Sequence, residues 1–361
     1  MERILREFVM LSSITLKLSK MKKIFVLISI LYILTSCSHD VIRHTSGKRE
    51  ICFEATVQTK GTMTTTDNLE KFYATAYSLS IENPNQLDDL SDLNLFFENV
   101  EFEKNGNAFY SYPAYYWPDV RSVIFVLWSP SLNDIGMEYY TEMVENDHGG
   151  FTLCLFKDVS PKLKISEQID ILYSLAAGTD GDNDDNNDDN GAYDGMLGMT
   201  NALGPVEFIH ILSSIKIQAK GMSSYNYHIK GIRIANVWGT ADYLFTGLNN
   251  YSNKTSYEEL YDTPIEFSDE TISVMPSETD FAFLLPQTLT AWNPNDPDSI
   301  GAYVAVLLHT EDQNGNVVYP ASGEANAYGW ASIPISGQWE AGTTYTYTLD
   351  FSEGGFGYPA P

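Results

Sequence analysis

The sequence predicts an all-β protein, and its 361 residues suit two β-sandwiches better than one. Short runs of alternating apolar and polar residues, rich in β-branched and aromatic side chains, recur along the chain. Clusters of Gly, Pro, Asn and Asp separate these runs, and no segment carries a long stripe of apolar residues at helical spacing. Hydrophobic residues make up 43% of the chain and aromatics 13%, which is enough material for packed cores.

The first half contains six strand-like runs. An Asn-Gly pair at residues 105 and 106 predicts a tight turn, and residues 87–95 favour a short helix or turn. We assign this half to an N-terminal β-sandwich of residues 51–208. The expected strands are residues 51–57, 72–77, 94–102, 123–128, 151–159 and 169–175.

The second half repeats the pattern from residue 209 to residue 361, which we assign to a C-terminal β-sandwich. Turn residues again divide the runs, as in Asn314-Gly315 and Pro294-Asn295. The expected strands are residues 211–219, 228–237, 243–245, 271–275, 281–285, 302–308 and 345–351.

The N-terminus differs from the body and predicts a lipoprotein signal peptide. Lys22 and Lys23 precede eleven uncharged, mostly apolar residues at 24–34, about half the length that spans a bilayer core. The segment closes as Leu-Thr-Ser-Cys at Cys37, which resembles a bacterial lipobox. We therefore expect residues 1–36 to be a leader, Cys37 to carry lipid, including palmitate, and residues 37–50 to form a tether. The alternative is an ordinary secretory signal with an incidental cysteine.

The charge of the chain excludes one class of partner. Its formal net charge is −27, with 21 basic and 48 acidic residues. Six of these bases and only two of the acids lie in residues 1–36, so the rest of the chain carries a net charge of −31. A chain this acidic has no electrostatic footprint for nucleic acid.

An acidic segment at residues 178–195 holds seven Asp and almost no apolar residue. Asp180, Asp182 and Asp184 are spaced like the start of an EF-hand loop, but Asp185 stands where Gly is needed and Gly191 where Glu is needed. A solvated acidic loop is the favoured interpretation, and weak Ca²⁺ binding is the alternative. The sequence indicates no other metal site and no cofactor.

Catalytic motifs are absent from the sequence. It contains no G-x-S-x-G, H-E-x-x-H, P-loop or G-x-G-x-x-G pattern, and the six His are scattered. We interpret His210 as a hydrogen-bonded residue at a sheet edge rather than a metal ligand. Cys52 and Cys154 are expected to be separately buried rather than bridged. The chain is expected not to be an enzyme.

Two tryptophans are candidates for sugar binding. Trp117 lies in a Y-P-A-Y-Y-W-P run, and Trp292 lies in the second half. Indole rings stack on pyranose faces, but all-β domains use most of their aromatics in cores and at strand edges. A surface glycan-binding lipoprotein without a pilus role is therefore the alternative function.

Several stretches, in their order and spacing, are similar to the fimbrillin-like (Mfa-like) lipoproteins of Bacteroidota, relatives of type V pilus subunits. The similarity covers about residues 21–361. The matching stretches are the lipobox, the strands at 51–57 and 72–77, a Thr-rich segment at 62–66, Y-W-P at 116–118, the apolar strand at 123–130, D-I-L-Y-S at 170–174, F-I-H-I-L-S-S-I at 208–215, L-L-P-Q at 284–287 and the W-to-F pattern at 339–351.

This resemblance implies two tandem transthyretin-like β-sandwiches and export to the outer membrane and cell surface as part of a fimbrium. It also implies assembly with other pilus subunits by β-strand complementation, in which proteolysis after an Arg removes the first strand and a neighbour's strand fills the groove. This sequence departs from that pattern: the expected position holds Lys60, and a cut after Arg49 would release only the tether. This departure favours an adhesion-related anchor, tip or accessory subunit over a stalk subunit. The ligand of such a subunit would be a host or bacterial surface.

Overall fold

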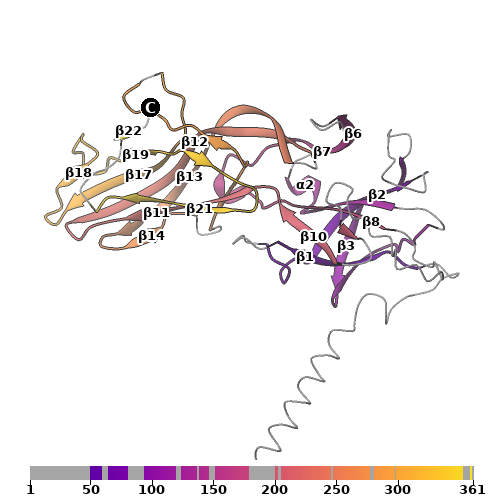
Figure 1. Ribbon diagram of the computed structural model, residues 1–361. Coiled ribbons are helices and arrows are strands. Elements are labelled where there is room, and N and C mark those ends of the chain that lie inside the picture. Colours follow the sequence, from indigo (N-terminus) through magenta and orange to yellow (C-terminus); the bar gives the residue numbers. More distant parts are fainter. Residues whose placement is uncertain are drawn as a thin grey trace, which may run out of the picture.

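The chain is almost entirely β-structure, as the sequence predicts. The computed structural model describes residues 49–58, 64–79, 93–118, 123–135, 138–145, 151–178, 200–201, 205–244, 247–276, 280–296, 298–352 and 358–359. Within these residues the helical elements are the one-turn helix α2 (Leu132–Ile135) and the 3₁₀ turn η4 (Ile165–Glu167). Figure 1 shows strands of the first half gathered at one end of the molecule and those of the second half at the other.

The first half forms an eight-stranded sheet that closes on itself, because β10 pairs with β1 through its first residues and with β8 through its last two. Phe53, Phe72, Phe102, Phe125 and Phe208 fill the inside of this ring. The strands, in spatial order, are β10 (Pro205–His210), β1 (Cys52–Val57), β4 (Ala108–Ser111), β3 (Leu93–Asn105), β2 (Lys71–Leu79), β5 (Val123–Ser129), β8 (Leu172–Gly178) and β9 (Thr200–Asn201).

The second half packs two main sheets against each other, and a short pair, β16 (Thr288–Leu289) with β20 (Gly337–Gln338), lies beside them. Ile215 and Ile217 of one sheet share a core with Ile232 and Val306 of the other. The smaller sheet contains β14 (Thr271–Ser273), β11 (Ser213–Lys220), β15 (Ala282–Leu284) and β21 (Thr344–Asp350). The larger contains β22 (Tyr358–Pro359), β19 (Gly329–Pro334), β17 (Tyr303–Asp312), β18 (Val317–Tyr319), β12 (Tyr225–Leu244), β13 (Gly247–Phe267), β7 (Phe151–Val159) and β6 (Glu138–Glu145).

The strand β12 connects the two halves. It runs for 20 residues and pairs with β13 along almost its whole length. On its other edge it pairs first with β17 and then with β7, which belongs to the first half of the sequence. Its register against β13 shifts between Ile234 and Val237, and Asn236 there has a positive φ of 59°. A bulge of this kind bends a strand, and here it lies where β12 changes partner.

A third core lies at the junction of the two halves. Trp128 and Tyr173 from the ring pack there with Phe156 of β7, Tyr243 of β12 and Phe283 of β15. The strand β5 is consequently buried on both faces. Its Val123, Phe125 and Leu127 face the ring interior, and Ile124, Val126 and Trp128 face the junction. Burial on both faces explains why this strand is a continuous apolar run rather than an alternating one.

The predicted turns and most predicted strands are present. Gly106 and Gly315 have positive φ values of 69° and 79° and connect β3 to β4 and β17 to β18. The expected helix or turn at residues 87–95 differs, because residues 93–95 begin β3 and the rest lies outside the described residues. The hairpin β6–β7 falls within residues 51–208 yet pairs with β12 from residues 209–361, so the proposed division at residue 208 does not separate the hydrogen-bonded sheets.

Candidate functional site at the first strand and the junction

The first strand, β1, is the element that closes the ring between β4 and β10. Cys52 and Phe53 pair antiparallel with β4, and the stretch from Glu54 to Val57 pairs parallel with β10. The strand therefore changes partner halfway along its length. Removing it would leave facing edges of β4 and β10 without the pairing they have here.

Phe53 anchors β1 in the ring interior. Its side chain is fully buried, and its ring centroid lies 5.1 Å from Phe102, 5.1 Å from Phe125 and 5.8 Å from Phe72, all in edge-to-face geometry. Ile51 and Val57 are buried on the same face. Burial of a Phe side chain contributes about 1.5–3 kcal/mol, and each aromatic pair about 0.5–1.5 kcal/mol more. Loss of β1 would therefore open an aromatic groove.

The two candidate processing sites flank β1. Arg49 lies before it: its carbonyl accepts a hydrogen bond from the Trp117 backbone N–H at 2.9 Å, and its guanidinium lies 5.7 Å from the Trp117 ring centroid. A cut after Arg49 leaves β1 in place. Lys60 lies outside the described residues, two positions after Gln58, whose backbone N–H donates to the Phe208 carbonyl at 2.9 Å. A cut after Lys60 separates all of β1 from the rest of the chain.

The two tryptophans singled out for sugar stacking are buried. Trp117 is 2% exposed and packs edge-to-face on Phe125 at 5.5 Å. Trp292 is 5% exposed and lies 5.3 Å from the ring of Tyr303. Neither indole presents a free face in this conformation, and a sugar would have to displace the packing around it.

Four further predicted positions lie outside the described residues. They are Cys37 and, in the acidic segment, Asp180, Asp182 and Asp184. In the described part of the chain, no group of three or more His, Cys, Asp or Glu side chains is arranged to hold a metal ion. The same residues contain no helix long and apolar enough to cross a membrane.

The last long strand, β21, lies beside β11. It pairs parallel with β11 from Ser214–Thr344 to Lys220–Asp350. Asp350 closes this pairing with a 3.0 Å ion pair to Lys220. Hydrogen bonds from the Ser352 hydroxyl and backbone N–H, with the nearby Lys220, lower the pKa of Asp350 from 3.8 to about 2. Beyond it, Tyr358 and Pro359 form β22 and pair with β19.

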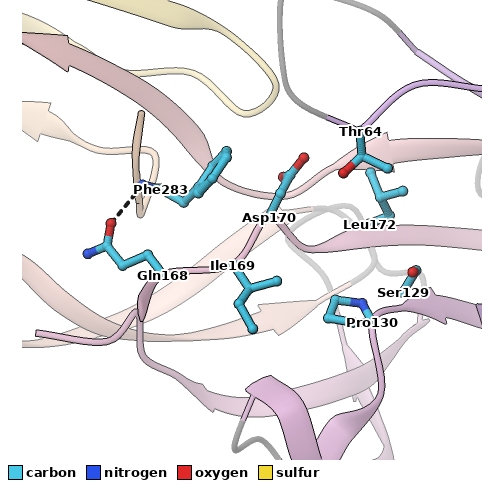
Figure 2. Close-up of a pocket in the computed structure, with 8 residues that line it drawn as sticks. All are labelled: Thr64, Ser129, Pro130, Gln168, Ile169, Asp170, Leu172 and Phe283. Carbon is cyan, nitrogen blue, oxygen red and sulfur yellow. Dashed lines mark hydrogen bonds between the residues drawn. The ribbon is translucent and has the colours of Figure 1, made fainter. Parts of the chain in front are cut away.

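A pocket of about 210 Å³ lies at the junction, bounded by the ends of β5 and β8, the segment before β8, and β15. Thr64, Ser129, Pro130, Gln168, Ile169, Asp170, Leu172 and Phe283 line it (Figure 2). Asp170 is 7% exposed, and its Oδ2 lies 2.8 Å from Nδ1 of the buried His210. Since a carboxylate accepts, the Nδ1 of His210 carries the hydrogen.

The sequence predicts His210 to be a hydrogen-bonded residue at a sheet edge. Its contact with Asp170 agrees with the hydrogen bond, but His210 is buried in β10, which pairs with both β1 and β8. The sequence did not indicate Asp170 as the partner, because the two residues are 40 positions apart and belong to different strand runs. Their only sequence signal is that each falls in one of the stretches that carry the family resemblance.

The geometry thus defines an all-β protein with a ring closed by its own first strand and a second half joined through a shared strand. The family model described as fimbrillin-like matches residues 55–356. The chain belongs to the fimbrillin-like family, and the resemblance seen in the sequence is confirmed. A search of the curated proteins finds no match.

One solved structure supports the fold. A fimbrial protein from Bacteroides vulgatus is similar over 84% of this chain and 96% of its own, with a TM-score of 0.51 and 14% identity. A fimbrial assembly protein from Parabacteroides distasonis is similar over 85% of this chain and 93% of its own, with a TM-score of 0.32 and 10% identity. At these identities the first similarity bears on the fold alone, and the second is too distant to add to it.

Proposed function

We propose that this chain is a cell-surface structural and adhesion protein, without catalytic activity, that serves as an anchor, tip or accessory subunit of a fimbrium. Membership of the fimbrillin-like family supports a fimbrial role at the cell surface. We further propose that neighbouring pilus subunits join it by β-strand complementation at the position of β1.

The observation that carries the strand-complementation proposal is the place of β1 in the ring. It is a single short strand, it pairs with β4 on one side and β10 on the other, and it buries Phe53 among three other Phe rings. A strand from another subunit could replace both its main-chain pairing and its central anchor. Because donor and acceptor surfaces differ, such an interface adds subunits in a row rather than closing a dimer.

The flanking sequence supports a subunit that keeps β1 unless a lysine-specific protease acts. Arg49 precedes β1 and Lys60 follows it, so an arginine-specific cut trims the tether and a lysine-specific cut frees the strand. Retention of β1 and of the lipid on Cys37 would leave the acceptor groove filled from within, as suits an anchor. Removal of β1 would open the groove, as suits a subunit that accepts a neighbour.

The experiment treats the full mature chain with a lysine-specific or an arginine-specific protease and analyses it unboiled on a denaturing gel. If the proposal holds, lysine-specific cleavage gives a ladder of multimers, and arginine-specific cleavage gives a monomer that retains β1. Lys60→Ala is the matched control, because it should abolish the ladder without touching the ring. A chain that loses β1 and stays monomeric even at high concentration contradicts strand complementation.

A peptide experiment tests the groove directly. A labelled peptide of residues 50–58 is added to the lysine-cleaved chain after its own first strand has been removed under denaturing conditions. We expect the peptide to bind, and a peptide with Phe53→Asp not to bind, because a carboxylate cannot enter the aromatic groove unpaired. Equal binding of the two peptides would show that the groove does not select the anchor residue.

The lipid anchor is tested separately. Cells that express the chain are grown with labelled palmitate, and the mature protein is isolated and fractionated with the outer membrane. We expect label in the wild type and none in Cys37→Ser. Label that persists in Cys37→Ser would refute lipidation at this residue and leave the strand proposal untouched.

A further inference from the structure

The strand β13 carries a wide bulge at the surface of the second half. In this bulge residues 261–264 lie opposite a single residue of β12, Lys230. Pro264 has no N–H to donate to a ladder, and a bulge of this kind interrupts the pairing and re-aims the side chains around it. Side chains of the bulge line a pocket of about 590 Å³. Its other walls come from η4 and the residue before it, from β13 on both sides of the bulge, and from residues 275–276.

This bulge pocket has the size and lining of a small-molecule site. Its volume falls within the roughly 300–1,000 Å³ that such sites occupy in proteins. Met275 and Ile265 contribute apolar surface and pack with the core of the second half. Leu260 is 57% exposed, and Asp262 and Thr263 are exposed as well, so the pocket opens to solvent along the bulge.

Glu259 contributes a hydrogen-bond acceptor to the bulge pocket. Its side chain is 7% exposed, and its Oε2 accepts from the Ser166 backbone N–H at 2.8 Å. Its Oε1 accepts no hydrogen bond from the described residues and is not sealed from solvent. Because Glu259 lines the pocket, Oε1 is the oxygen of this carboxylate that a ligand can reach.

Lys164 places a donor beside that acceptor. Its Nζ lies 3.6 Å from Oε1 of Glu259 and 3.9 Å from Oε1 of Glu167, and both separations are longer than a hydrogen bond. The side chain of Lys164 is 55% exposed, and an exposed ion pair of this kind contributes little stability. The ammonium and the carboxylate thus lie side by side on the pocket wall, and neither satisfies the other's hydrogen-bonding capacity.

This pair of groups selects a neutral ligand that carries hydroxyls. An anion would be repelled by Glu259 and Asp262, and a cation would be repelled by Lys164. A hydroxyl both accepts and donates, so one hydroxyl can satisfy Lys164 and Glu259 together without adding a charge. A sugar also has C–H groups that can pack against the apolar part of the wall.

We propose that the bulge pocket binds a neutral saccharide, with one sugar hydroxyl bridging Nζ of Lys164 and Oε1 of Glu259. As a surface ligand the sugar rests on the adhesion role proposed above. Its binding requires neither strand exchange nor the removal of β1, because the pocket lies wholly in β13, η4 and their neighbours.

The test titrates soluble sugars into the full mature chain and follows the sugar protons by saturation-transfer NMR. The neutral probes are the methyl glycosides of glucose, galactose and mannose. Glucosamine and glucuronic acid are the cationic and anionic counterparts, at a mildly acidic pH at which glucosamine is charged. We expect saturable binding of at least one neutral glycoside, with a dissociation constant on the order of 1–10 mM that is the same at low and high salt. Each charged sugar should bind roughly tenfold more weakly than that glycoside.

Two variants and a control tie the binding to the bridging pair. Lys164→Met removes the donor, and Glu259→Gln removes the charge of the acceptor, so each should weaken sugar binding roughly tenfold or more. Lys162→Met is the matched control, because the same substitution two residues away lies outside the pocket lining and should leave binding unchanged. Lys164 is exposed, so its variant keeps the test valid even if Glu259→Gln fails to fold.

Three results would overturn the proposal: no saturable binding of any neutral glycoside, tighter binding of a charged sugar, or equal binding in wild type and Lys164→Met. Any of these would leave water as the occupant of the pocket or assign it to an ion. None of them bears on strand complementation, which the protease and peptide experiments test. Conversely, a missing ladder of multimers would leave sugar binding untouched.

Discussion

The ring of Phe53 meets the ring of Phe125 edge-to-face, with centroids 5.1 Å apart, and this contact joins the first strand to β5, which is buried on both faces. It is the point at which β1 is held from the inside, whereas its main-chain pairing holds it from the sides. The two kinds of contact can be separated by substitution.

We predict that Phe53→Ala destabilises the chain by about 3–5 kcal/mol, because it removes three aromatic contacts and leaves a cavity in the ring. Urea denaturation followed by circular dichroism measures the free energy of unfolding. Thr56→Ala, on the exposed face of the same strand, is the matched control and should change it by less than about 0.5 kcal/mol. Similar losses for the two variants would mean that the main-chain pairing, and not the anchor, holds β1.

The junction core should couple the two halves. Phe156 lies 6.0 Å from Trp128, 6.0 Å from Tyr173 and 6.2 Å from Tyr243, ring centroid to ring centroid. Phe156→Ala is expected to lower the free energy of unfolding by about 3–5 kcal/mol and to broaden or split the calorimetric transition. The exposed Lys162→Ala serves as the reference. A single transition of unchanged shape, shifted by the full amount, would show that the coupling runs through β12 alone.

Asp350 provides a pH-dependent contact. Because its pKa in the folded chain is about 2 rather than 3.8, its contribution to stability is present above pH 3.8 and disappears as the pH falls through about 2. NMR titration of the side-chain carboxyl should show this low value, and Ser352→Ala should return it toward 3.8, since the Ser352 hydroxyl is the main cause of the shift. A low pKa that survives Ser352→Ala would assign the shift to the Ser352 backbone N–H and Lys220 rather than to the hydroxyl.

Gly301 should not tolerate a side chain. A Cβ built on it would lie 2.2 Å from the backbone carbonyl of Ala291 and 2.2 Å from the backbone nitrogen of Trp292. No side-chain rotation moves a Cβ, so only a shift of the backbone could relieve this overlap. Gly301→Ala is expected to cost about 1–3 kcal/mol through forced backbone movement, as overpacking does. Ile300→Ala, at a neighbouring side chain that is 76% exposed, is the control. Chemical denaturation of both variants decides the matter, and equal stabilities would contradict the close approach.

The local sequence pattern predicted the strands whose residues alternate between apolar and polar or are continuously apolar. It did so because burial on one face or on both faces of a sheet determines which positions are apolar. The strand β5 is an example: residues 123–128 read as a strand, and burial on both faces accounts for the run. By contrast, β13 was missed because it pairs only along one edge and keeps many polar, exposed residues. The predicted runs at 228–237 and 243–245 proved to be one strand, since a bulge interrupts the pattern without ending the pairing.

Long-range partners were beyond the reach of sequence pattern. Nothing in residues 138–159 indicates that this hairpin leaves its own sheet to pair with β12, because hydrogen bonding between backbones has no side-chain signature. Asp170 and His210 are a similar case at the level of a site. For the tryptophans, the sequence suggested a site that the fold does not provide. The sequence around Trp117 and Trp292 does not distinguish a buried ring from an exposed one, and only the fold shows that both rings are covered.

The 20 residues of β12 have a fully extended length of about 66 Å at ~3.3 Å per residue, and the strand passes from one half of the protein into the other without a break. A pulling force applied along this strand would therefore act on a continuous backbone that is hydrogen-bonded to β13 on one edge and to β17 and then β7 on the other. The two halves are thus joined by a continuous, hydrogen-bonded strand rather than by a flexible linker.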